Sequence, residues 1–322
     1  MKKTYEIGQA PLAGYTNRAM REIALEYGAD FVFSEMISCE SILQNNINAL
    51  KIIPDKPCRI QLFTANPDYI SRAAEKLKNL ATWFDINAGC PVKKVIKKGA
   101  GSALLKDLDR LKKMIKNLKH SVDVPVSVKI RTGWNKDDIE NIVTQLSKEK
   151  PDAFFIHGRI LKQGFSGRAN WSSINKAVKL LDGSGIRVYG SGDLFTPEDV
   201  KTALEKYGVN GVIVARGAIG NPWIFSQTKE LLEKGSYRPV ADEERLLVFK
   251  KHLDMLTEIF GERRGIFESR KFFASYTKGL HNSRTMRSKY MKLANIEDIY
   301  DFLTKYINDI KRNSNQKQAR SL

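Results

Sequence analysis

Short apolar runs with the composition of strands alternate with amphipathic helical stretches along most of this chain. The strand-like runs occupy residues 7–12, 31–33, 59–63, 83–87, 125–130, 153–157, 187–190 and 211–215. Most of the intervals carry helical periodicity, at residues 67–77, 108–118, 138–147, 173–181, 197–206 and 223–232. Strands that alternate with helices form parallel sheets, and eight such units favour an α/β fold of the (β/α)8 TIM-barrel type over an open doubly wound sheet.

The alternation stops after Gly235, and a purely helical pattern follows. Three consecutive acidic residues at 242–244 come shortly after Pro239, which is typical of a helix start. Apolar residues then recur at helical spacing over residues 246–260 and again over 296–310. We therefore expect a TIM-barrel domain at residues 1–235 and a small all-helical C-terminal domain at residues 236–322, with a polar tail after Lys311.

Composition narrows the class of protein. Hydrophobic residues make up 42% of the 322, yet no apolar run approaches the roughly 18 residues of a membrane helix. The first residues lack the apolar stretch of a secretory signal, and we expect a cytoplasmic protein without a membrane partner. Cys39, Cys58 and Cys90 are too few and too widely spaced for a disulfide framework or a CxxC metal site. We expect no bound metal, and we expect Cys39 and Cys58 to be buried as small apolar residues.

The formal net charge of +18 indicates a polyanionic partner, either nucleic acid or an anionic membrane surface. Residues 269–296 concentrate this charge, because lysines and arginines occur there without one acidic residue. The basic residues are Arg270, Lys271, Lys278, Arg284, Arg287, Lys289 and Lys292, and the aromatic residues among them are Phe272, Phe273, Tyr276 and Tyr290. Basic side chains interleaved with aromatic ones are typical of RNA-binding elements, which favours nucleic acid over a merely solvated basic face.

The active site of a TIM barrel lies at the carboxyl ends of its strands. Polar, reactive or glycine-containing segments follow the predicted strands: Pro11-Leu12-Ala13-Gly14, Glu35, Gln61, Asn87 with Cys90, Lys129 with Arg131, His157-Gly158-Arg159, Ser191-Gly192-Asp193 and Ala215-Arg216-Gly217. The last two segments follow strands seven and eight, whose loops bind phosphate in many such barrels. Their glycines let backbone N–H groups approach an anion, and Arg216 adds a cation. We expect a phosphorylated ligand there, either a cofactor or a sugar-phosphate substrate.

Cys90 occupies a glycine- and proline-containing turn directly after the fourth strand, in the segment Asn87-Ala88-Gly89-Cys90-Pro91. A thiol in such a turn is a poor core residue and a candidate chemical reagent. Lys93 and Lys94 follow it, and nearby cations would lower the thiol pKa unless their side chains point away from it.

Several segments, taken in order along the chain, resemble motifs of the tRNA-dihydrouridine synthases. They are residues 10–16, 87–95, 99–104, 128–134, 156–159, 190–193 and 215–223, and the likeness continues through residues 270–280. The resemblance implies a TIM barrel that binds FMN and uses NADPH or NADH to reduce uridines in tRNA to 5,6-dihydrouridine. Leu12, Ser191 and Ala215 depart from the usual methionine, asparagine and glycine. These departures leave the cofactor expectation intact, because the implied contacts are made largely by the backbone.

The resemblance also implies roles for individual residues. Reduced flavin would deliver hydride to C6 of uracil and Cys90 a proton to C5, which suits a thiol with an unperturbed pKa of about 8.5. The implied flavin contacts are Pro11, Leu12, Ala13, Gln61, Lys129, His157, Ser191, Gly192, Asp193, Ala215 and Arg216. The implied substrate contacts are Asn87 at the uracil edge, Lys93 and Lys94 at the RNA-facing rim, and Arg270, Lys271, Lys278, Arg284 and Arg287 in the helical domain.

Two alternatives stay open at this point. The first is a flavin barrel enzyme of small-molecule redox chemistry, similar to dihydroorotate dehydrogenase, although a basic helical domain argues against it. The second is a non-catalytic RNA-binding protein built on a barrel that keeps flavin for structure. Nothing in the sequence implies a stable protein partner, and we expect a monomer.

Overall fold

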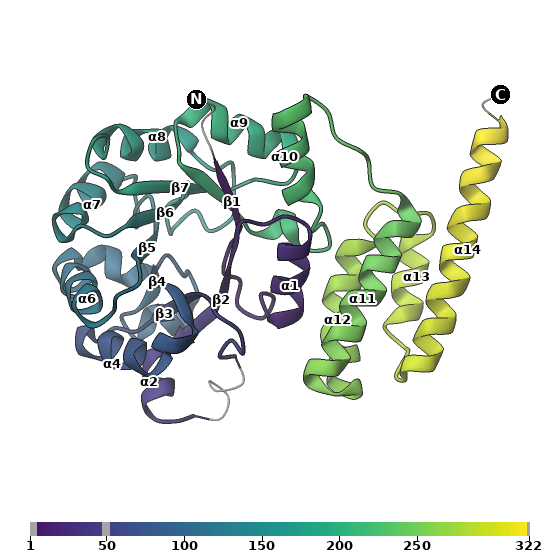
Figure 1. The fold of residues 1–322 in the computed structure, drawn as a ribbon, viewed down its shortest axis with the longest axis horizontal. Helices are drawn as coiled ribbons and strands as arrows, with labels where there is room; N and C mark the ends of the chain where they lie inside the picture. Colours follow the sequence, from purple (N-terminus) through teal and green to yellow (C-terminus); the bar gives the residue numbers. More distant parts are fainter. Residues whose placement is uncertain (1–4, 47–51, 321–322) are drawn as a thin grey trace.

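A closed barrel of eight parallel strands forms the centre of the computed structural model, which describes residues 5–46 and 52–320 (Figure 1). The strands are β1 (Glu6–Gln9), β2 (Phe31–Ser38), β3 (Cys58–Phe63), β4 (Ala81–Ala88), β5 (Val126–Arg131), β6 (Ala153–His157), β7 (Arg187–Ser191) and β8 (Gly211–Val214). They pair in chain order, and β8 closes the barrel on β1. The predicted TIM barrel is confirmed, although β1 is shorter and β2 longer than expected.

Helices wrap the outside of the barrel and connect its strands (Figure 1). They are α1 (Arg18–Glu26), α2 (Cys39–Leu43), α4 (Pro67–Leu77), α5 (Lys93–Lys97), α6 (Leu108–Ser121), α7 (Ile139–Leu146), α8 (Trp171–Leu180), α9 (Pro197–Tyr207) and α10 (Ile224–Lys234). Short 3-10 turns occur at Lys78–Leu80, Gly101–Lys106, Ser147–Glu149 and Arg216–Ala218. Asn66 and Thr196 cap α4 and α9 through their side chains, and a proline follows each cap at the first helical position.

Aromatic side chains fill the amino-terminal end of the barrel interior. The residues of this layer are Phe31, Phe33, Trp83, Phe155 and Tyr189. The Arg59 guanidinium lies between them, 3.4 Å from the centroid of the Phe31 ring and 4.4 Å from that of Trp83. Glu6 forms an ion pair with Arg59 at 3.3 Å. This packing closes one end of the barrel and leaves the carboxyl ends of the strands as the place for a ligand.

The remaining cysteines belong to the apolar core. Cys39 and Cys58 are 0% and 8% exposed, which confirms that they are buried. No helix among residues 5–46 and 52–320 is long and apolar enough to cross a membrane. Within the same residues, no group of three or more His, Cys, Asp or Glu side chains is placed to hold a metal ion.

A bundle of four further helices lies beside the barrel (Figure 1). Its members are α11 (Asp242–Phe260), α12 (Glu262–Tyr276), α13 (Ser283–Tyr290) and α14 (Ile296–Arg320). Residues 312–320, expected as a polar tail, continue α14 as helix. The sequence after Ile296 contains no glycine or proline up to Arg320, so nothing interrupts the backbone hydrogen bonding.

The aromatic residues of the basic stretch form the core of this bundle. Phe272, Phe273, Tyr276 and Tyr290 are at most 1% exposed. The rings of Phe273 and Tyr290 stack with their centroids 4.1 Å apart. The expectation that these aromatics interleave with the basic residues on an RNA-facing surface is therefore wrong. Helical periodicity turns them inward, while the basic residues between them remain at or near the surface.

The bundle and the barrel share a packed junction. Trp223, just before α10, contacts Tyr276 of α12, and Tyr15 of the β1–α1 loop contacts Phe272, each edge to face. Gly220 has φ +66°, and a Cβ added there would lie 2.6 Å from the backbone nitrogen of Tyr276. Such close contacts hold the two domains in one arrangement.

Candidate active site

A cavity of about 280 Å³ opens at the carboxyl ends of the strands. The residues expected to contact the cofactor or the reacting base all line it: Pro11, Leu12, Ala13, Gln61, Asn87, Cys90, Lys129, His157, Ser191, Gly192, Asp193, Ala215 and Arg216. It is also lined by Met36, Arg131, Phe165 and Phe195, to which sequence reasoning gave no role. Lys93 and Lys94 lie outside the cavity and are exposed on α5.

The backbone around Cys90 is held from both sides. The side-chain oxygen of Asn87 accepts the backbone N–H of Gly89 at 3.2 Å and that of Cys90 at 2.9 Å. The carbonyl oxygen of Cys90 accepts the backbone N–H of Ser102 at 3.1 Å. Gly101 approaches so closely that a Cβ there would lie 2.9 Å from the same carbonyl oxygen. The turn after β4 therefore presents the thiol to the cavity from a fixed backbone.

Burial raises the pKa of the Cys90 thiol above its ordinary value. The backbone N–H of Val92 opposes this rise most, followed by the positive charges of Lys129 and Arg131. Lys93 and Lys94 do not contribute, because their side chains are exposed on the outer face of the turn. The lowering of the pKa that their sequence position suggested is therefore absent in the described structure, and the thiol is protonated at neutral pH.

A buried chain of polar side chains runs from the barrel interior to this turn. Asp85 accepts the Ser127 hydroxyl at 2.6 Å and the Gln61 amide nitrogen at 2.7 Å. The Gln61 oxygen in turn accepts the amide nitrogen of Asn87 at 2.7 Å. The remaining N–H of Asn87 points to the sulfur of Met36 at 3.7 Å. The expected contact of Asn87 with uracil stays a prediction, and only this weakly bonded N–H is left to make it.

Lys129 projects into the cavity from β5 and has no hydrogen bond or ion pair with any described residue. Burial lowers its pKa to about 8, and the carboxylate of Asp85 opposes that change. Burial raises the pKa of Asp85 to about 6, against hydrogen bonds from Ser127 and Gln61 and the charge of Lys129. Lys129 is therefore a cation at neutral pH that can pair with a negative charge on a ligand.

The imidazole of His157 is held neutral. Burial lowers its pKa to about 2, and four cations, Lys129, Arg131, Arg159 and Arg216, act in the same direction. Its Nε2 atom lies 3.4 Å from the Arg159 guanidinium, which can only donate. Nε2 is therefore the acceptor and the ring proton is on Nδ1. His157 can hydrogen-bond a ligand at neutral pH, but it holds no second proton to transfer.

Free backbone donors gather at the ends of β7 and β8. Gly192 and Asp193 have φ +127° and +53°, so the backbone leaves the extended conformation of β7 at this point. The backbone N–H groups of Gly192, Asp193 and Arg216 donate to no acceptor among the described residues. The Arg216 guanidinium lies 3.5 Å from Asp193 and is 40% exposed, so it retains donors for a ligand. These groups together have the chemistry to bind an anion such as a phosphate.

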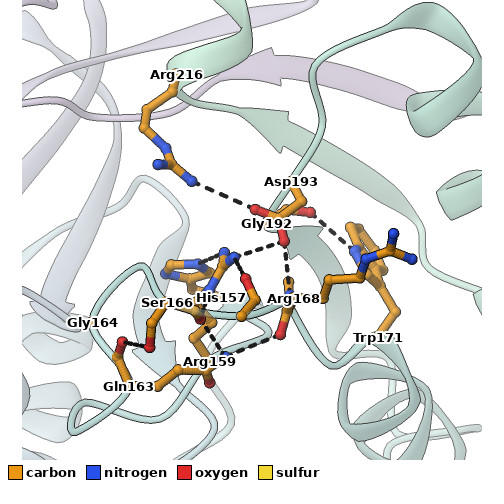
Figure 2. Close-up of polar contacts among 12 residues, drawn as sticks. His157, Arg159, Gln163, Gly164, Ser166, Arg168, Trp171, Gly192, Asp193 and Arg216 are labelled. Atoms are coloured by element: carbon orange, nitrogen blue, oxygen red, sulfur yellow. Dashed lines mark hydrogen bonds and ion pairs between the residues drawn. The ribbon is translucent and has the colours of Figure 1, made fainter.

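Figure 2 shows the network that supports this site from below. Arg159, which is 2% exposed, donates to the carboxylate of Asp193 and to the carbonyl oxygen of Gly167, both at 2.7 Å. The backbone N–H of Ala169 also donates to Asp193, at 2.8 Å. Trp171 at the start of α8 donates its ring N–H to the carbonyl oxygen of Gly192 at 3.0 Å. The β6–α8 loop and the β7 loop are thereby fixed to one another.

Arg131, like Arg159, is a buried arginine at the barrel mouth for which the sequence predicted no role. It donates to the carbonyl oxygens of Gly89 at 3.0 Å and of Gly164 at 3.1 Å, which ties the Cys90 turn to the β6–α8 loop. A signal for it exists in the sequence, since Lys129 and Arg131 are two residues apart at one strand end, as are His157 and Arg159. Residues at this spacing share one face of a strand.

The expected tRNA contacts of the helical domain differ in their exposure. Lys278 and Arg284 are exposed. Arg270, Lys271 and Arg287 are half-buried, and each donates to a backbone carbonyl: that of Leu293, Gly14 and Ser283, respectively. Of the five, Lys278 and Arg284 therefore have the freest side chains for a polyanion.

The chain matches the family model for dihydrouridine synthase (Dus) over residues 8–314. A probable tRNA-dihydrouridine synthase of Treponema pallidum (strain Nichols) is 37% identical over 284 residues, which cover 84% of each chain. The tRNA-dihydrouridine synthase B of Pseudomonas aeruginosa is 34% identical over 292 residues, which cover 88% of this chain and 87% of that protein.

Two solved structures share the barrel architecture at low sequence identity. Histamine dehydrogenase from Rhizobium sp. 4-9 is 12% identical with a TM-score of 0.53, over 79% of this chain and 49% of that chain. DHODH from Eimeria tenella is 15% identical with a TM-score of 0.52, over 72% of this chain and 82% of that chain. At such identities the likeness concerns the fold alone.

Proposed function

Because the chain belongs to the dihydrouridine synthase family, we propose that it reduces uridines of tRNA to 5,6-dihydrouridine in the cytoplasm, with bound FMN and NADPH or NADH as reductant. The observation that carries this proposal is the convergence of a protonated thiol, an unpaired lysine and a group of free backbone N–H donors on one cavity. A small-molecule flavin enzyme would have no use for the exposed basic residues of the attached bundle.

The residues at the ends of β7 and β8 fit the phosphate of FMN. The free N–H groups of Gly192, Asp193 and Arg216 would bind its oxygens, and the Arg216 guanidinium would add a charge-assisted hydrogen bond. Ser191 and Ala215, at the strand ends just before these loops, would contact it through their backbones. Pro11, Leu12 and Ala13 follow β1, which pairs with β8, and they line the cavity where an apolar ring can pack.

Lys129, Gln61 and His157 fit the polar edge of the isoalloxazine ring. Lys129 has an unpaired ammonium group that would stabilise negative charge on the ring. Gln61 keeps one N–H free for the cavity, and the neutral His157 offers its Nδ1–H. When bound and reduced, FMN supplies the two electrons, as hydride, that saturate the C5–C6 double bond of uracil.

Cys90 supplies the proton that completes the reduction. The new C–H bond at C5 takes its proton from the thiol, and the thiolate that remains is reprotonated from solvent. The raised pKa of the thiol keeps this proton in place until negative charge develops on the pyrimidine ring. Asn87 and Ser102 hold the Cys90 backbone so that the thiol stays at the cavity wall.

The helical domain, residues 236–322, would bind the tRNA. A base within folded tRNA reaches the cavity only when it is extruded from the stack, and phosphate contacts must hold the RNA meanwhile. The exposed Lys278 and Arg284, with Lys93 and Lys94 at the rim, are placed for such contacts. Arg270, Lys271 and Arg287 would act at shorter range because of their internal hydrogen bonds. We propose that a monomer suffices for this arrangement.

The direct test incubates the purified chain with FMN, NADPH and an unmodified tRNA transcript and quantifies dihydrouridine by mass spectrometry. Parallel reactions contain NADH, or free uridine and orotate in place of tRNA. The proposal predicts dihydrouridine in tRNA and no turnover of the free pyrimidines. Turnover of a free pyrimidine without modified tRNA would establish the small-molecule alternative, and tRNA binding without any turnover would establish the non-catalytic one.

A further inference from the structure

The buried hydrogen-bond chain behind Cys90 has a fixed direction. At its upper end the side-chain oxygen of Asn87 accepts two backbone N–H groups, those of Gly89 and Cys90. Backbone N–H groups can only donate, so this atom must be the oxygen and the amide nitrogen of Asn87 must face Gln61. That nitrogen lies 2.7 Å from the Gln61 side chain, which must present its own oxygen there.

The lower end of the chain imposes the same direction. With its oxygen facing Asn87, Gln61 turns its amide nitrogen to Asp85, at 2.7 Å. The other carboxylate oxygen accepts the Ser127 hydroxyl at 2.6 Å, and this hydroxyl accepts the Trp83 ring N–H at 2.7 Å. A ring N–H can only donate, so Ser127 must donate to Asp85. Asp85, which is 0% exposed, therefore accepts from both sides.

We propose that Asp85 is a positioning residue that sets the orientation of the Gln61 and Asn87 amides and, through them, the conformation of the Cys90 turn. A side chain that accepted a hydrogen bond at one atom and donated one at the other could rotate and reverse the direction of every hydrogen bond in this series. A carboxylate accepts at both oxygens, so it admits only the observed direction. Reversal would place an N–H of Asn87 against the backbone N–H of Cys90 and leave buried donors unpaired.

The same direction determines what Gln61 offers to a ligand. One N–H of its amide is used by Asp85, and the second has no acceptor among the described residues. Gln61 lines the cavity, so this second N–H is available there. The edge of the bound ring that meets Gln61 must then carry an acceptor, such as a carbonyl oxygen or an unprotonated ring nitrogen. This part of the inference rests on the proposed function, whereas the effect on the Cys90 turn does not.

The test exchanges the amide and the carboxylate between positions 61 and 85. Gln61→Glu places a second carboxyl group against Asp85, so the contact between residues 61 and 85 loses its donor above the pH at which the two groups share a proton. Asp85→Asn/Gln61→Glu restores it, because the new Asn donates to the new Glu while still accepting from Ser127. Asn87 and the Cys90 turn keep their bonds in the exchanged pair, and the net charge equals that of the wild type.

The first measurement follows alkylation of Cys90 by iodoacetamide in the cofactor-free protein, by mass spectrometry over a range of pH. Cys39 and Cys58 are buried and serve as internal references. We expect the limiting rate to rise about tenfold or more in Gln61→Glu and to return to the wild-type rate in the exchanged pair. If Gln61→Glu fails to fold, recovery of folding in the exchanged pair supports the proposal equally. The proposal is overturned if Cys90 is alkylated as fast in the exchanged pair as in Gln61→Glu, or if the exchanged pair does not fold. A wild-type alkylation rate in Gln61→Glu also overturns it.

The second measurement is FMN affinity by fluorescence quenching. The exchanged pair presents a carboxylate oxygen to the cavity where the wild type presents an N–H. We expect its affinity for FMN to fall at least tenfold although its Cys90 turn is restored. Unchanged affinity would overturn the donor role of Gln61. If the alkylation rates follow the expected pattern but the wild-type protein makes no dihydrouridine, the proposed function is rejected and the role of Asp85 stands.

Discussion

The barrel mouth and the helical bundle place the same kinds of residue in opposite ways. At the mouth, charged and polar side chains point inward, and aromatic rings such as Phe165 and Phe195 are exposed at the rim. In the bundle, aromatic rings such as Phe273 and Tyr290 are buried and the basic side chains lie at or near the surface. One region turns fixed polar groups towards a cavity, whereas the other leaves its charge at the surface.

The two regions also differ in whether their charged side chains hold the structure together. Arg131 and Arg159 at the mouth are each 2% exposed and hold loops together. Lys278 and Arg284 in the bundle are exposed. Substitutions at the mouth should therefore affect folding of the loops and cofactor binding, and those on the bundle should affect tRNA binding alone. Deletion of the bundle would not separate these functions, because its core continues into the barrel through Trp223 and Tyr276.

The largest effect is expected for Arg159→Met at the mouth. The substitution leaves Asp193 without its buried partner and frees the carbonyl oxygen of Gly167, a loss of about 3–5 kcal/mol reduced by the partial exposure of Asp193. We expect FMN affinity, measured by fluorescence quenching, to fall at least 100-fold. Arg168→Met, in the same loop but exposed, should bind FMN like the wild type. Equal effects of the two substitutions would contradict the supporting role of Arg159.

The junction between the regions is tested by Gly220→Ala. A Cβ would lie 2.6 Å from the backbone nitrogen of Tyr276 and the residue would keep φ +66°, so we expect about 2–3 kcal/mol of destabilisation in chemical unfolding. Gly279→Ala, at φ +83° with open space around it, should cost only about 1 kcal/mol. Similar values for both would mean that the domains are not packed as described.

Acid should weaken the same junction through His252. Burial lowers the pKa of this histidine from 6.5 to about 3, so the folded state keeps it neutral while the unfolded state takes up a proton below pH 6.5. Its contribution to stability is complete above pH 6.5 and declines by about 1.4 kcal/mol per pH unit as the pH falls towards 3. We expect the free energy of unfolding of His252→Gln to decrease less between pH 7 and pH 5 than that of the wild type. Parallel pH profiles would reject this assignment.

The smallest effect is expected for charge reversal on the bundle surface. Lys278→Glu/Arg284→Glu should raise the KM for tRNA about tenfold and make its salt dependence shallower, with unchanged FMN affinity and kcat. The control Lys116→Glu/Lys179→Glu changes the same charge on the exposed surfaces of α6 and α8. If the control raises KM as much, the bundle is not the specific contact for tRNA.

The sequence predicted the barrel and the set of cavity residues because both follow from regular spacing. Eight alternating units determine the closed barrel, and parallel strands bring their carboxyl ends together, so Gln61, Cys90 and Lys129 could be grouped without a structure. The roles of Asp85 and Arg159 could not be found in this way. They depend on which side chains meet across strands, and that is decided by register and loop conformation.

For the helical region, the presence of helices could be predicted from the sequence, but the residues on its surface could not. Its existence followed from apolar periodicity, but basic and aromatic residues close together in sequence suggested a mixed surface. A helix separates neighbours onto different faces, so Phe272 is buried while Lys271 reaches the barrel loop at Gly14. The thiol pKa could not be predicted from the sequence for a similar reason, since the proximity of Lys93 and Lys94 in sequence did not place their side chains near Cys90.

We infer that the barrel mouth performs the chemistry through Cys90, while the bundle only delivers the tRNA. Rapid mixing of the FMN-loaded Cys90→Ala variant tests it, first with NADPH and then, once reduced, with tRNA, each followed by flavin absorbance. We predict reduction by NADPH at the wild-type rate, unchanged tRNA affinity, and reoxidation by tRNA slowed at least 100-fold. Reoxidation by tRNA at the wild-type rate, with dihydrouridine formed, would contradict the account.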